Sequence, residues 1–325
     1  MELAWVSKYS FALIPAEEVV PFWNLSPHAT VFTHPDLLSR LSNRVDWWLA
    51  LKGNEPLCLW PVTLPDGNQV DLPNFTYWVG PMWSKVMDAT PAHSWLALST
   101  EVYQGFIRVF VDHYGAIVAS LPLGLLDIRV FDWWNYHAPE KPRIRAKARY
   151  TARLYNLQDL TARQIEAGYR PLRRRELRRV TKAGFPEKVT DWTPEELNTL
   201  YADVMRLQGI PVLNTEATQI TALAHLARTC MGEVVSFRDA ETGNLVTAVV
   251  LLLAKGVANM VLNLTSSPWR GTGLPTLAVH TAILAAKVRG ADAFDFNGAN
   301  SPTRGDDKHS YGAAPKLYFN ICYPG

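Results

Sequence analysis

One order of helices, strands and turns occurs twice along these 325 residues, and this repetition limits the folds that the chain can adopt. In the second half, the sequence predicts two helices, a meander of three strands, a loop, a third helix and a short strand. The first half repeats this order, with matching turn residues and little residue identity. The chain is therefore predicted to hold two copies of one α/β unit.

The second copy has the sharper local signals. Thr193 and Glu196 form a capping box, and Pro194 stands at the first helical position, so a helix should begin there. This helix is expected to end at Gly209. The elements expected after it are a helix at 216–230, strands at 233–238, 245–254 and 257–264, a helix near Pro275 that stops at Gly290, and a strand at 293–297.

The first copy is predicted from the same kinds of signal. Its expected elements are a short helix that begins at 33–36, strands at 46–51, 56–63 and 69–79, a long helix at 91–114 and a strand after Gly115. The segment Gly80–Ser84 takes the place that Ser267–Arg270 has in the second copy. Because the turns match in order, we expect both copies to share one architecture.

A connector separates the copies. It comprises a strand pattern at 142–155, a capping box at Thr161 and Gln164, and a basic helix at 171–183 that Gly184 should stop. A further strand is expected at 316–323. The predicted domains are therefore an N-terminal domain at 1–140, a connector at 141–192 and a C-terminal domain at 193–325 that holds the donor site. The expected fold class is α/β (α+β), with a mixed, mostly antiparallel sheet flanked by helices in each domain.

Composition places the chain among ordinary globular proteins. Hydrophobic residues make up 48% of it, and the formal net charge of +2 favours no class of partner. No apolar run is long enough to span a membrane, and the start of the chain lacks the basic segment of a signal peptide. The three cysteines form no C-x-x-C pair, and the eight histidines form no H-x-x-x-H motif. We therefore expect a cytoplasmic protein with no membrane segment, no disulfide framework and no metal site.

Tryptophan is frequent in this sequence. The chain has twelve tryptophans, and Trp47-Trp48 and Trp133-Trp134 are adjacent pairs. Large aromatic side chains mostly fill cores, although an amphipathic ring can also form the wall of a pocket. The sequence leaves both roles open.

Four short stretches carry a resemblance to a known family. They are Tyr150–Leu154, the basic helix Arg173–Gly184, Ala291–Gly298 and Lys308–Gly312. The last two resemble a "Y/F-D-F-x-G" strand and an "F-K-x-x-F-G" turn. Together with the repeated α/β order, they resemble the Fem-type double-domain branch of the Gcn5-related N-acetyltransferase (GNAT) superfamily. The resemblance implies two tandem GNAT-like domains over about residues 33–323, the first with a degenerate cofactor loop.

The resemblance also implies an enzyme that moves an acyl group to an amine. Its donor is either an aminoacyl-tRNA or an acyl-coenzyme A, with no permanently bound cofactor, and its acceptor is an amine-bearing small molecule or peptide. We favour Fem-type aminoacyl-tRNA-dependent amide bond formation in peptide or small-molecule biosynthesis, which makes tRNA a candidate partner. The alternatives are an acyl-CoA-dependent N-acetyltransferase and a non-catalytic amine- or peptide-binding protein on the same fold. The coiled-coil arm of some cell-wall Fem proteins is absent from this sequence, which argues against a cell-wall peptide as acceptor.

The loop before the third helix of the second copy has the place of the GNAT pyrophosphate loop, which resembles Q/R-x-x-G-x-G/A. Arg270 and Gly273 match this pattern, but Pro275 does not, and proline lacks the N–H that a phosphate would bind. An ordinary glycine-bearing loop is the alternative interpretation. The candidate donor-binding residues are Arg270, Gly271, Thr272 and Gly273, together with backbone N–H groups around Asn263 and Thr265, which by resemblance would bind the oxyanion.

The basic helix is a second candidate for binding phosphate. Seven basic residues and one acid lie between Arg170 and Lys182. Arg174 and Arg178 form a like-charge pair at i,i+4, which weakens a helix unless an anion neutralises it. The pattern favours a phosphate-rich partner, with a solvated connector helix as the alternative.

Polar residues gather after the last strand of the second copy. By resemblance, Lys308 contacts the anionic groups of a substrate or the developing oxyanion. Tyr311 is a candidate general acid, and Asp295 and Asp46 are candidate bases, with a base supplied by the substrate as the open alternative. The candidate substrate-binding residues nearby are Asn297, Asn300 and Arg304. Two alternatives stay open: Lys308 ties the loop to a carboxylate, and Tyr311 is only packed. His280 is expected to be a buried, hydrogen-bonded histidine.

Overall fold

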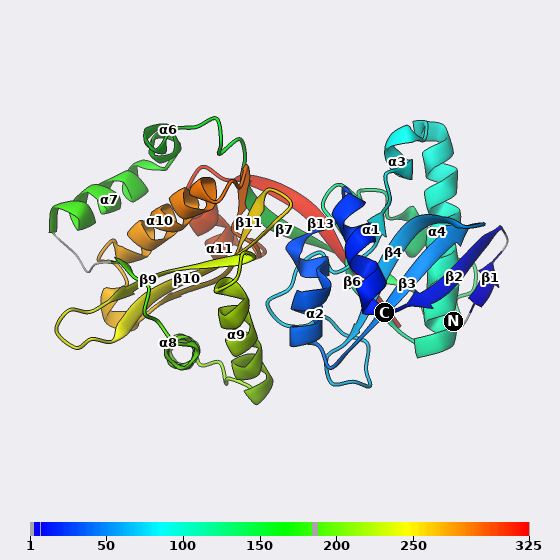
Figure 1. Ribbon diagram of the computed structural model, residues 1–325, viewed down its shortest axis with the longest axis horizontal. Helices are drawn as coiled ribbons and strands as arrows, with labels where there is room; N and C mark the ends of the chain where they lie inside the picture. Colours follow the sequence, from blue (N-terminus) through cyan, green and yellow to red (C-terminus); the bar gives the residue numbers. More distant parts are fainter. Residues whose placement is uncertain (1–2, 7, 184–187, 325) are drawn as a thin grey trace. The chain divides into compact units, whose positions relative to one another are not determined.

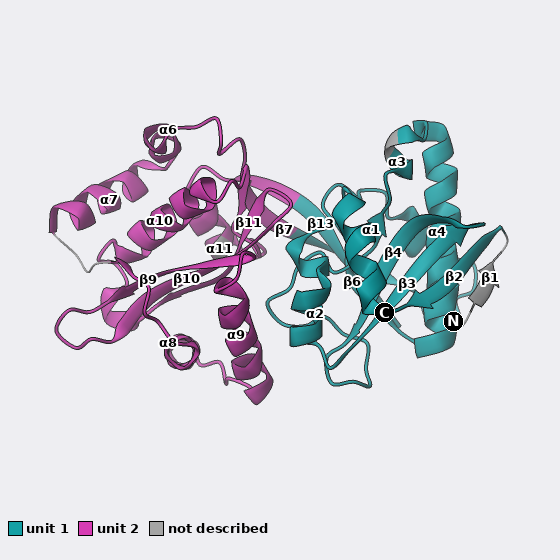
Figure 2. Cartoon of the chain, viewed as in Figure 1, with its two compact units in different colours: residues 1–149, 317–325 teal, residues 150–316 magenta. Residues whose placement is uncertain are grey.

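The computed structural model describes residues 3–6, 8–183 and 188–324. Its contacts divide the chain into unit 1, residues 1–149 with 317–325, and unit 2, residues 150–316 (Figure 2). These bounds differ from the expected domains, since most of the connector lies in unit 2 and the last residues lie in unit 1. The last residues belong to unit 1 because they pair with a distant strand of that unit, as Asn320 does with Ser120. The predicted helix stop at Gly184 lies outside the described residues.

Unit 1 contains a five-stranded antiparallel sheet in the order β1-β2-β3-β4-β5, together with an antiparallel pair formed by β6 and β13 (Figure 1). Its strands are β1 (Leu3–Val6), β2 (Tyr9–Ile14), β3 (Arg44–Lys52), β4 (Glu55–Leu64), β5 (Met82–Trp83), β6 (Ile117–Ser120) and the end of β13 (Ala314–Tyr323). Its helices are α1 (Val19–Leu25), α2 (Pro35–Leu41), α3 (Val86–Ala89), α4 (Ala92–Tyr114) and α5 (Arg129–Asp132), with short 3₁₀ turns η1 (Ala16–Glu18) and η2 (Val31–Thr33).

The strand predicted at 69–79 is wrong. This segment is irregular, because Phe75 and Trp78 have φ angles of 61° and 51°, which no extended strand allows. The third strand of the meander is instead β5, where Trp83 pairs with Cys58 of β4. Trp78 is nevertheless buried in the core. The spacing of apolar residues in this segment therefore resembles that of a strand although the backbone is not extended.

The core of unit 1 is rich in aromatic rings beneath α4. Trp60 contacts Phe106 and Phe110 of this helix edge to face, with ring centroids 5.4 and 5.2 Å apart. At Gly105 the helix meets Phe11 so closely that a Cβ would lie 2.1 Å from its ring. The expected end of α4 is confirmed, since Gly115 adopts the left-handed conformation that stops a helix.

Unit 2 has a sheet in the order β7-β12-β11-β10-β9-β8, in which β11 and β12 are parallel and the other neighbours are antiparallel. Its strands are β7 (Arg145–Leu154), β8 (Lys188–Val189), β9 (Gly232–Arg238), β10 (Leu245–Ala254), β11 (Val257–Thr265) and β12 (Ala293–Asp295). Its helices are α6 (Ala162–Ala167), α7 (Pro171–Ala183), α8 (Pro194–Leu207), α9 (Asn214–Ala227), α10 (Leu274–Val288) and α11 (Pro302–His309), with the 3₁₀ turn η3 (Ser267–Trp269).

Helices cover both faces of the unit 2 sheet. Figure 1 shows α10 on one face, with α7 packed on its outer side, and α8 with α9 on the other face. The capping boxes at Thr161 and Thr193 are confirmed, since each side chain accepts a hydrogen bond from the third residue of its helix. The mixed, mostly antiparallel α/β architecture predicted from the sequence is therefore confirmed. Among the described residues, no helix is both long and apolar enough to cross a membrane.

Candidate functional site

Two neighbouring strands of unit 2 separate where the candidate site residues lie. β12 pairs with β11 over Val257–Asn259 only, whereas β11 continues to Thr265. The N–H of Ser266 donates to Val246 of β10, so by strand alternation Thr265 and Asn263 direct their N–H groups to the opposite edge. This edge of β11 lies beyond the end of the short β12. Its backbone donors are therefore placed where a ligand oxygen could accept from them.

Asp295 is fully buried at the end of β12, and it organises the residues around it. Its carboxylate accepts a hydrogen bond from Thr151, forms an ion pair with Arg153 at 2.7 Å and accepts from the backbone N–H of Asn297 at 2.8 Å. Burial raises the pKa of the Asp295 carboxyl, and the charge of Arg153 opposes this increase. The carboxylate has several protein partners, which is typical of a group that positions a site.

Two buried amides lie beside this carboxylate. Asn259 pairs with Asp295 in register, and the Nδ2 of Asn297 donates to the carbonyl of Met260 at 3.2 Å. Within the described part of the chain, the Oδ1 atoms of Asn259 and Asn297 accept no hydrogen bond. A buried acceptor without a donor is costly, so these two oxygens can receive N–H groups from a bound molecule.

Lys308 lies in α11 and holds the turn that follows β12. Its Nζ donates to the carbonyl of Asn297 and, at 2.9 Å, to that of Gly298. Both turn residues have positive φ, 52° and 42°, which also explains why β12 ends before the predicted residue 297. Asn300 completes the turn, because its Oδ1 accepts from the N–H of Tyr150 at 2.8 Å.

The glycine-bearing loop forms the start of α10. Gly273 caps the helix in the left-handed conformation, with a φ of 98°, and Thr272 accepts a hydrogen bond from the N–H of Leu274 at 3.2 Å. Arg270 is exposed, and its Nε donates to the carbonyl of Thr265 at 3.3 Å. Helix α7 covers this loop, since Arg179 donates to the carbonyl of Gly271 at 2.6 Å.

A protein carboxylate occupies the first turn of α10. Glu176 of α7 accepts a hydrogen bond from the hydroxyl of Thr276 at 2.5 Å. Arg173 donates to the same carboxylate at 2.8 Å, to Thr276 at 3.1 Å and to Ser310 at 2.7 Å, and it also pairs with Asp307. A carboxylate near a helix N-terminus is electrostatically favourable.

Tyr311 links this region to the strand end. Its ring stacks on Phe296, with centroids 5.5 Å apart, and lies 5.0 Å from the guanidinium of Arg173. Its hydroxyl reaches Thr276 at 3.5 Å. Burial raises the pKa of this hydroxyl well above its ordinary value, so the phenol stays protonated at neutral pH. His280 is half-buried rather than fully buried, and its Nδ1 lies 3.0 Å from the hydroxyl of Tyr169, so the expected hydrogen bond is present.

The basic helix forms one wall of a hollow on unit 2. The hollow has a volume of about 570 Å³ and lies between α6 and α7. It is lined by Arg163, Glu166, Ala167, Pro171, Arg174, Arg175 and Arg178. The Nε of Arg174 is buried and donates to no atom of the described residues. Four guanidinium groups against one carboxylate make this hollow suited to an anion with several charges.

The structure therefore groups the predicted residues into three neighbouring sets. Asp295, Asn297, Asn300 and Lys308 lie at the strand end, Arg270–Gly273 lie at the start of α10, and Arg174 with Arg178 lies at the hollow. The side chain of Arg304 is outside the described part of the structure. No group of three metal-ligating side chains occurs among the described residues. Sequence reasoning missed Asn259, Arg153 and Glu176 as members of these sets, because each depends on a partner distant in the sequence.

Alanine at Gly273 is expected to lower the free energy of unfolding by about 2 kcal/mol. Its Cβ would lie 2.9 Å from the backbone oxygen of Glu176, and its φ of 98° is strained for alanine. Gly271 is the matched control, with a φ of 79° but no atom within 4 Å of a Cβ. Urea denaturation should therefore show a larger loss for Gly273→Ala than for Gly271→Ala. Equal losses would contradict the close packing of α7 on this loop.

No protein-family model and no curated protein sequence matches this chain. Solved structures do match, over almost its whole length. FemX has a TM-score of 0.55 at 11% identity, covering 95% of this chain and 96% of FemX. L-PGS from Bacillus licheniformis has a TM-score of 0.53 at 12% identity, covering 94% of this chain and 91% of that one.

A third match is the tandem GNAT protein from the clavulanic acid biosynthesis pathway. It has a TM-score of 0.51 at 15% identity, and the match covers 97% of each chain. At such low identities the comparisons report on the fold, and they confirm the architecture that the repeated sequence order predicted. The chain therefore has the tandem GNAT fold, which it shares with Fem-like double-domain structures.

Proposed function

We propose that the protein is an N-acyltransferase that takes its acyl group from an aminoacyl-tRNA and passes it to an amine on a small molecule or peptide. In this reaction the amine nitrogen attacks the ester carbonyl carbon, and a new C–N bond forms. The bond from that carbon to the terminal ribose oxygen breaks, and the proton of the amine ends on the departing oxygen. The proposal makes unit 2 the donor-binding unit, in a cytoplasmic protein with no permanently bound cofactor.

The observation that carries the proposal is the Glu176 carboxylate at the start of α10. A coenzyme A pyrophosphate would need the backbone N–H groups and the positive end of this helix. Glu176 already accepts from the Thr276 hydroxyl there, so a pyrophosphate would have to compete with this carboxylate and its Arg173 partner for the first turn of the helix. Pro275 also removes one backbone donor from the first turn. These features favour a donor that does not carry its phosphates at this position.

The arginine-lined hollow supports a donor with a phosphate backbone. Its guanidinium groups come from two helices, and Arg174 and Arg178 lie one turn apart on α7. Like charges at this spacing destabilise a helix in isolation, and an anion between them removes that cost. A nucleic acid supplies successive phosphates along its backbone, which suits a hollow with several guanidinium groups.

The chemistry of acyl transfer is assigned to the diverging strand ends. The N–H groups of Asn263 and Thr265 would donate to the developing oxyanion, and the cationic Lys308 would add to this stabilisation. The free Oδ1 atoms of Asn259 and Asn297 would accept N–H groups of an amine. The protonated Tyr311 is the proposed acid for the departing oxygen, and Asp295 positions the strand end through Arg153.

One observation favours acyl-coenzyme A as a second candidate donor. Arg270 and Gly271 are exposed beside the loop, and a Cβ at Gly271 would meet no atom within 4 Å. This open backbone could receive a phosphate that avoids Glu176. Thermal-shift measurements with coenzyme A, acetyl-coenzyme A and a charged tRNA pool separate the two donors. Stabilisation by tRNA alone is expected, and stabilisation by coenzyme A alone would refute the proposal.

The tRNA affinity of the double variant Arg174→Gln/Arg178→Gln is expected to fall about tenfold or more. The slope of log affinity against log salt should decrease by about 1.5, because two phosphate contacts are lost. Arg206→Gln is the matched control, since Arg206 is an exposed arginine on α8 of the same unit. Filter binding across a salt series measures both quantities. An unchanged salt slope in the double variant would show that the hollow does not bind the RNA.

A further inference from the structure

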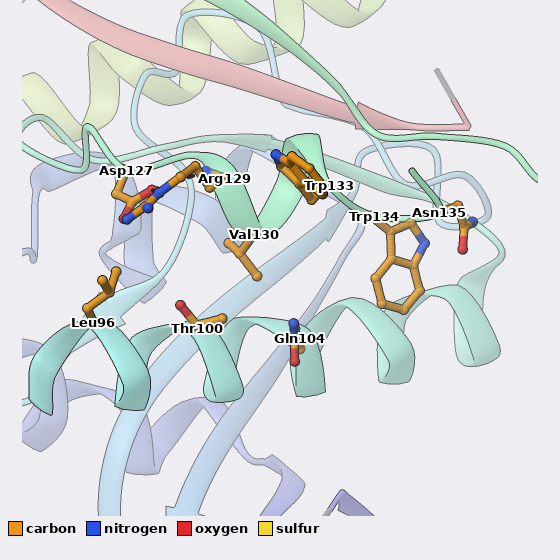
Figure 3. A pocket seen from close by; sticks show the side chains of 9 residues that line it. All are labelled: Leu96, Thr100, Gln104, Asp127, Arg129, Val130, Trp133, Trp134 and Asn135. Atoms are coloured by element: carbon orange, nitrogen blue, oxygen red, sulfur yellow. Dashed lines mark hydrogen bonds and ion pairs between the residues drawn. The ribbon is translucent and has the colours of Figure 1, made fainter. Parts of the chain in front are cut away.

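Unit 1 contains a pocket that the acyl-transfer chemistry does not use. It lies between one face of α4 and the segment Asp127–Asn135, which includes α5 (Figure 3). Its volume of about 570 Å³ lies within the range of small-molecule sites. Leu96, Thr100 and Gln104 come from α4 at intervals of four residues, so they form a single stripe along the helix. The pocket is therefore built from a rigid helix and one facing segment.

An exposed indole forms the aromatic wall of this pocket. Trp133 is 53% exposed, which is unusual for a tryptophan. Tyr136 stacks on it, with ring centroids 4.3 Å apart and planes inclined by 23°, and Arg143 lies 4.9 Å from the Tyr136 ring. This stack fixes the orientation of the indole. A flat apolar surface is thus held at the pocket without being buried by the protein itself.

The charges that line the pocket neutralise each other. Arg129 donates to both carboxylate oxygens of Asp127, at 2.8 and 2.6 Å. The hydrogen bonds from Arg129 lower the pKa of the Asp127 carboxyl, so the pair stays ionised and its net charge is zero. An anionic ligand would meet the carboxylate, and a cationic ligand would meet the guanidinium. The pocket therefore suits a neutral molecule.

Three further lining side chains can both donate and accept hydrogen bonds, and the indole N–H of Trp134 adds a donor. The three are the hydroxyl of Thr100 and the carboxamides of Gln104 and Asn135, of which the Nδ2 of Asn135 already donates to the carbonyl of Pro142 at 2.7 Å. A purely apolar ligand would remove water from these groups without replacing the hydrogen bonds that the water makes. A pyranose ring has hydroxyls that donate and accept at its rim and a face of C–H groups that can stack on an indole. Its hydroxyls therefore match the polar side chains of the lining, and its C–H face matches the indole.

We propose that this pocket binds a neutral saccharide ring, with its C–H face on Trp133 and its hydroxyls at Gln104, Asn135 and the Asp127–Arg129 pair. The site lies within unit 1 and is independent of the donor chemistry proposed for unit 2. It gives the protein a second binding function, directed to a carbohydrate or to a carbohydrate-bearing molecule.

Saturation-transfer NMR titrations of the full chain test this proposal. The probes are glucose, galactose, mannose and N-acetylglucosamine, with glucose 6-phosphate as the charged counterpart and adenosine as a flat, non-saccharide competitor. We expect saturable binding of at least one neutral sugar, weaker binding of the phosphate, and weaker binding of adenosine. Absence of saturable binding for all four neutral sugars would overturn the proposal, as would tighter binding of adenosine or of the phosphate.

Three variants locate the site. Trp133→Ala is expected to weaken sugar binding about tenfold or more, because it removes the stacking surface. Gln104→Leu keeps the size of an exposed side chain but removes its carboxamide, and should also weaken binding. Leu126→Ala is the matched control, since Leu126 is an exposed apolar residue, 62% exposed, beside the pocket but outside its lining. Equal affinity in Trp133→Ala and the wild type would refute the site.

Discussion

Alanine in place of Arg173 is expected to lower the free energy of unfolding by about 3 kcal/mol. Its side chain is largely buried and contacts Thr276 of α10, Asp307 of α11 and Ser310, which follows α11. Removing the guanidinium leaves the half-buried carboxylate of Glu176 without its cation beside Thr276. Chemical denaturation, followed by circular dichroism, measures the loss.

Two further variants separate the contacts of Arg173 from a general effect of charge. Arg173→Lys keeps the charge but loses the planar fork of donors, so its stability should lie between alanine and wild type. Arg178→Ala removes an exposed arginine from the same helix and should change stability by less than about 0.5 kcal/mol. If the Arg173→Ala variant were as stable as the Arg178→Ala variant, the result would contradict the described packing of α7 on α10.

Replacing Lys308 by alanine is expected to lower kcat for acyl transfer by about 100-fold or more. The change removes the cation at the end of β12 and the two hydrogen bonds that hold the turn at Asn297 and Gly298. The thermal midpoint should stay nearly unchanged, because water can replace these bonds to backbone carbonyls. Single-turnover kinetics and a thermal melt measure the two effects.

Lys287 provides the matched control for this variant. Its Nζ also donates to two backbone carbonyls of unit 2, those of Leu157 and Gln158, at 2.7 and 2.8 Å. Lys287→Ala should therefore reproduce any loss of stability while leaving transfer intact. A Lys308→Ala enzyme with full activity, or one that loses stability and activity together, would show that Lys308 has only a structural role.

Local signals in the sequence predicted most of the elements of the fold. The capping boxes at Thr161 and Thr193 and the helix stop at Gly115 depend on contacts within a few residues, so sequence alone identifies them. The segment at 69–79 was wrongly predicted as a strand because Trp78 is buried although it lies outside any strand. The positive φ of Trp78 depends on packing against residues distant in the sequence. The spacing of apolar residues along the chain does not indicate such a conformation.

The candidate site could be predicted only in part for the same reason. Asn297 was predicted from its place after a strand and Lys308 from the resemblance of Lys308–Gly312 to a family turn, and the structure brings the two residues into contact. In the sequence, Glu176 is only the single acid in a basic segment. In the structure it accepts a hydrogen bond from Thr276 in the first turn of α10, one hundred positions away. No local pattern distinguishes such a carboxylate from a solvated one.

A labelled transfer assay tests the central claim most directly. The protein is incubated with a pool of amine acceptors and either a charged tRNA pool or acetyl-coenzyme A, each labelled in its acyl group. We predict that label moves from the charged tRNA to an amine, that Lys308→Ala stops this transfer, and that acetyl-coenzyme A yields no labelled amide. Transfer from acetyl-coenzyme A without transfer from tRNA would contradict the proposed donor, and no transfer from either would contradict the proposed acyltransferase activity.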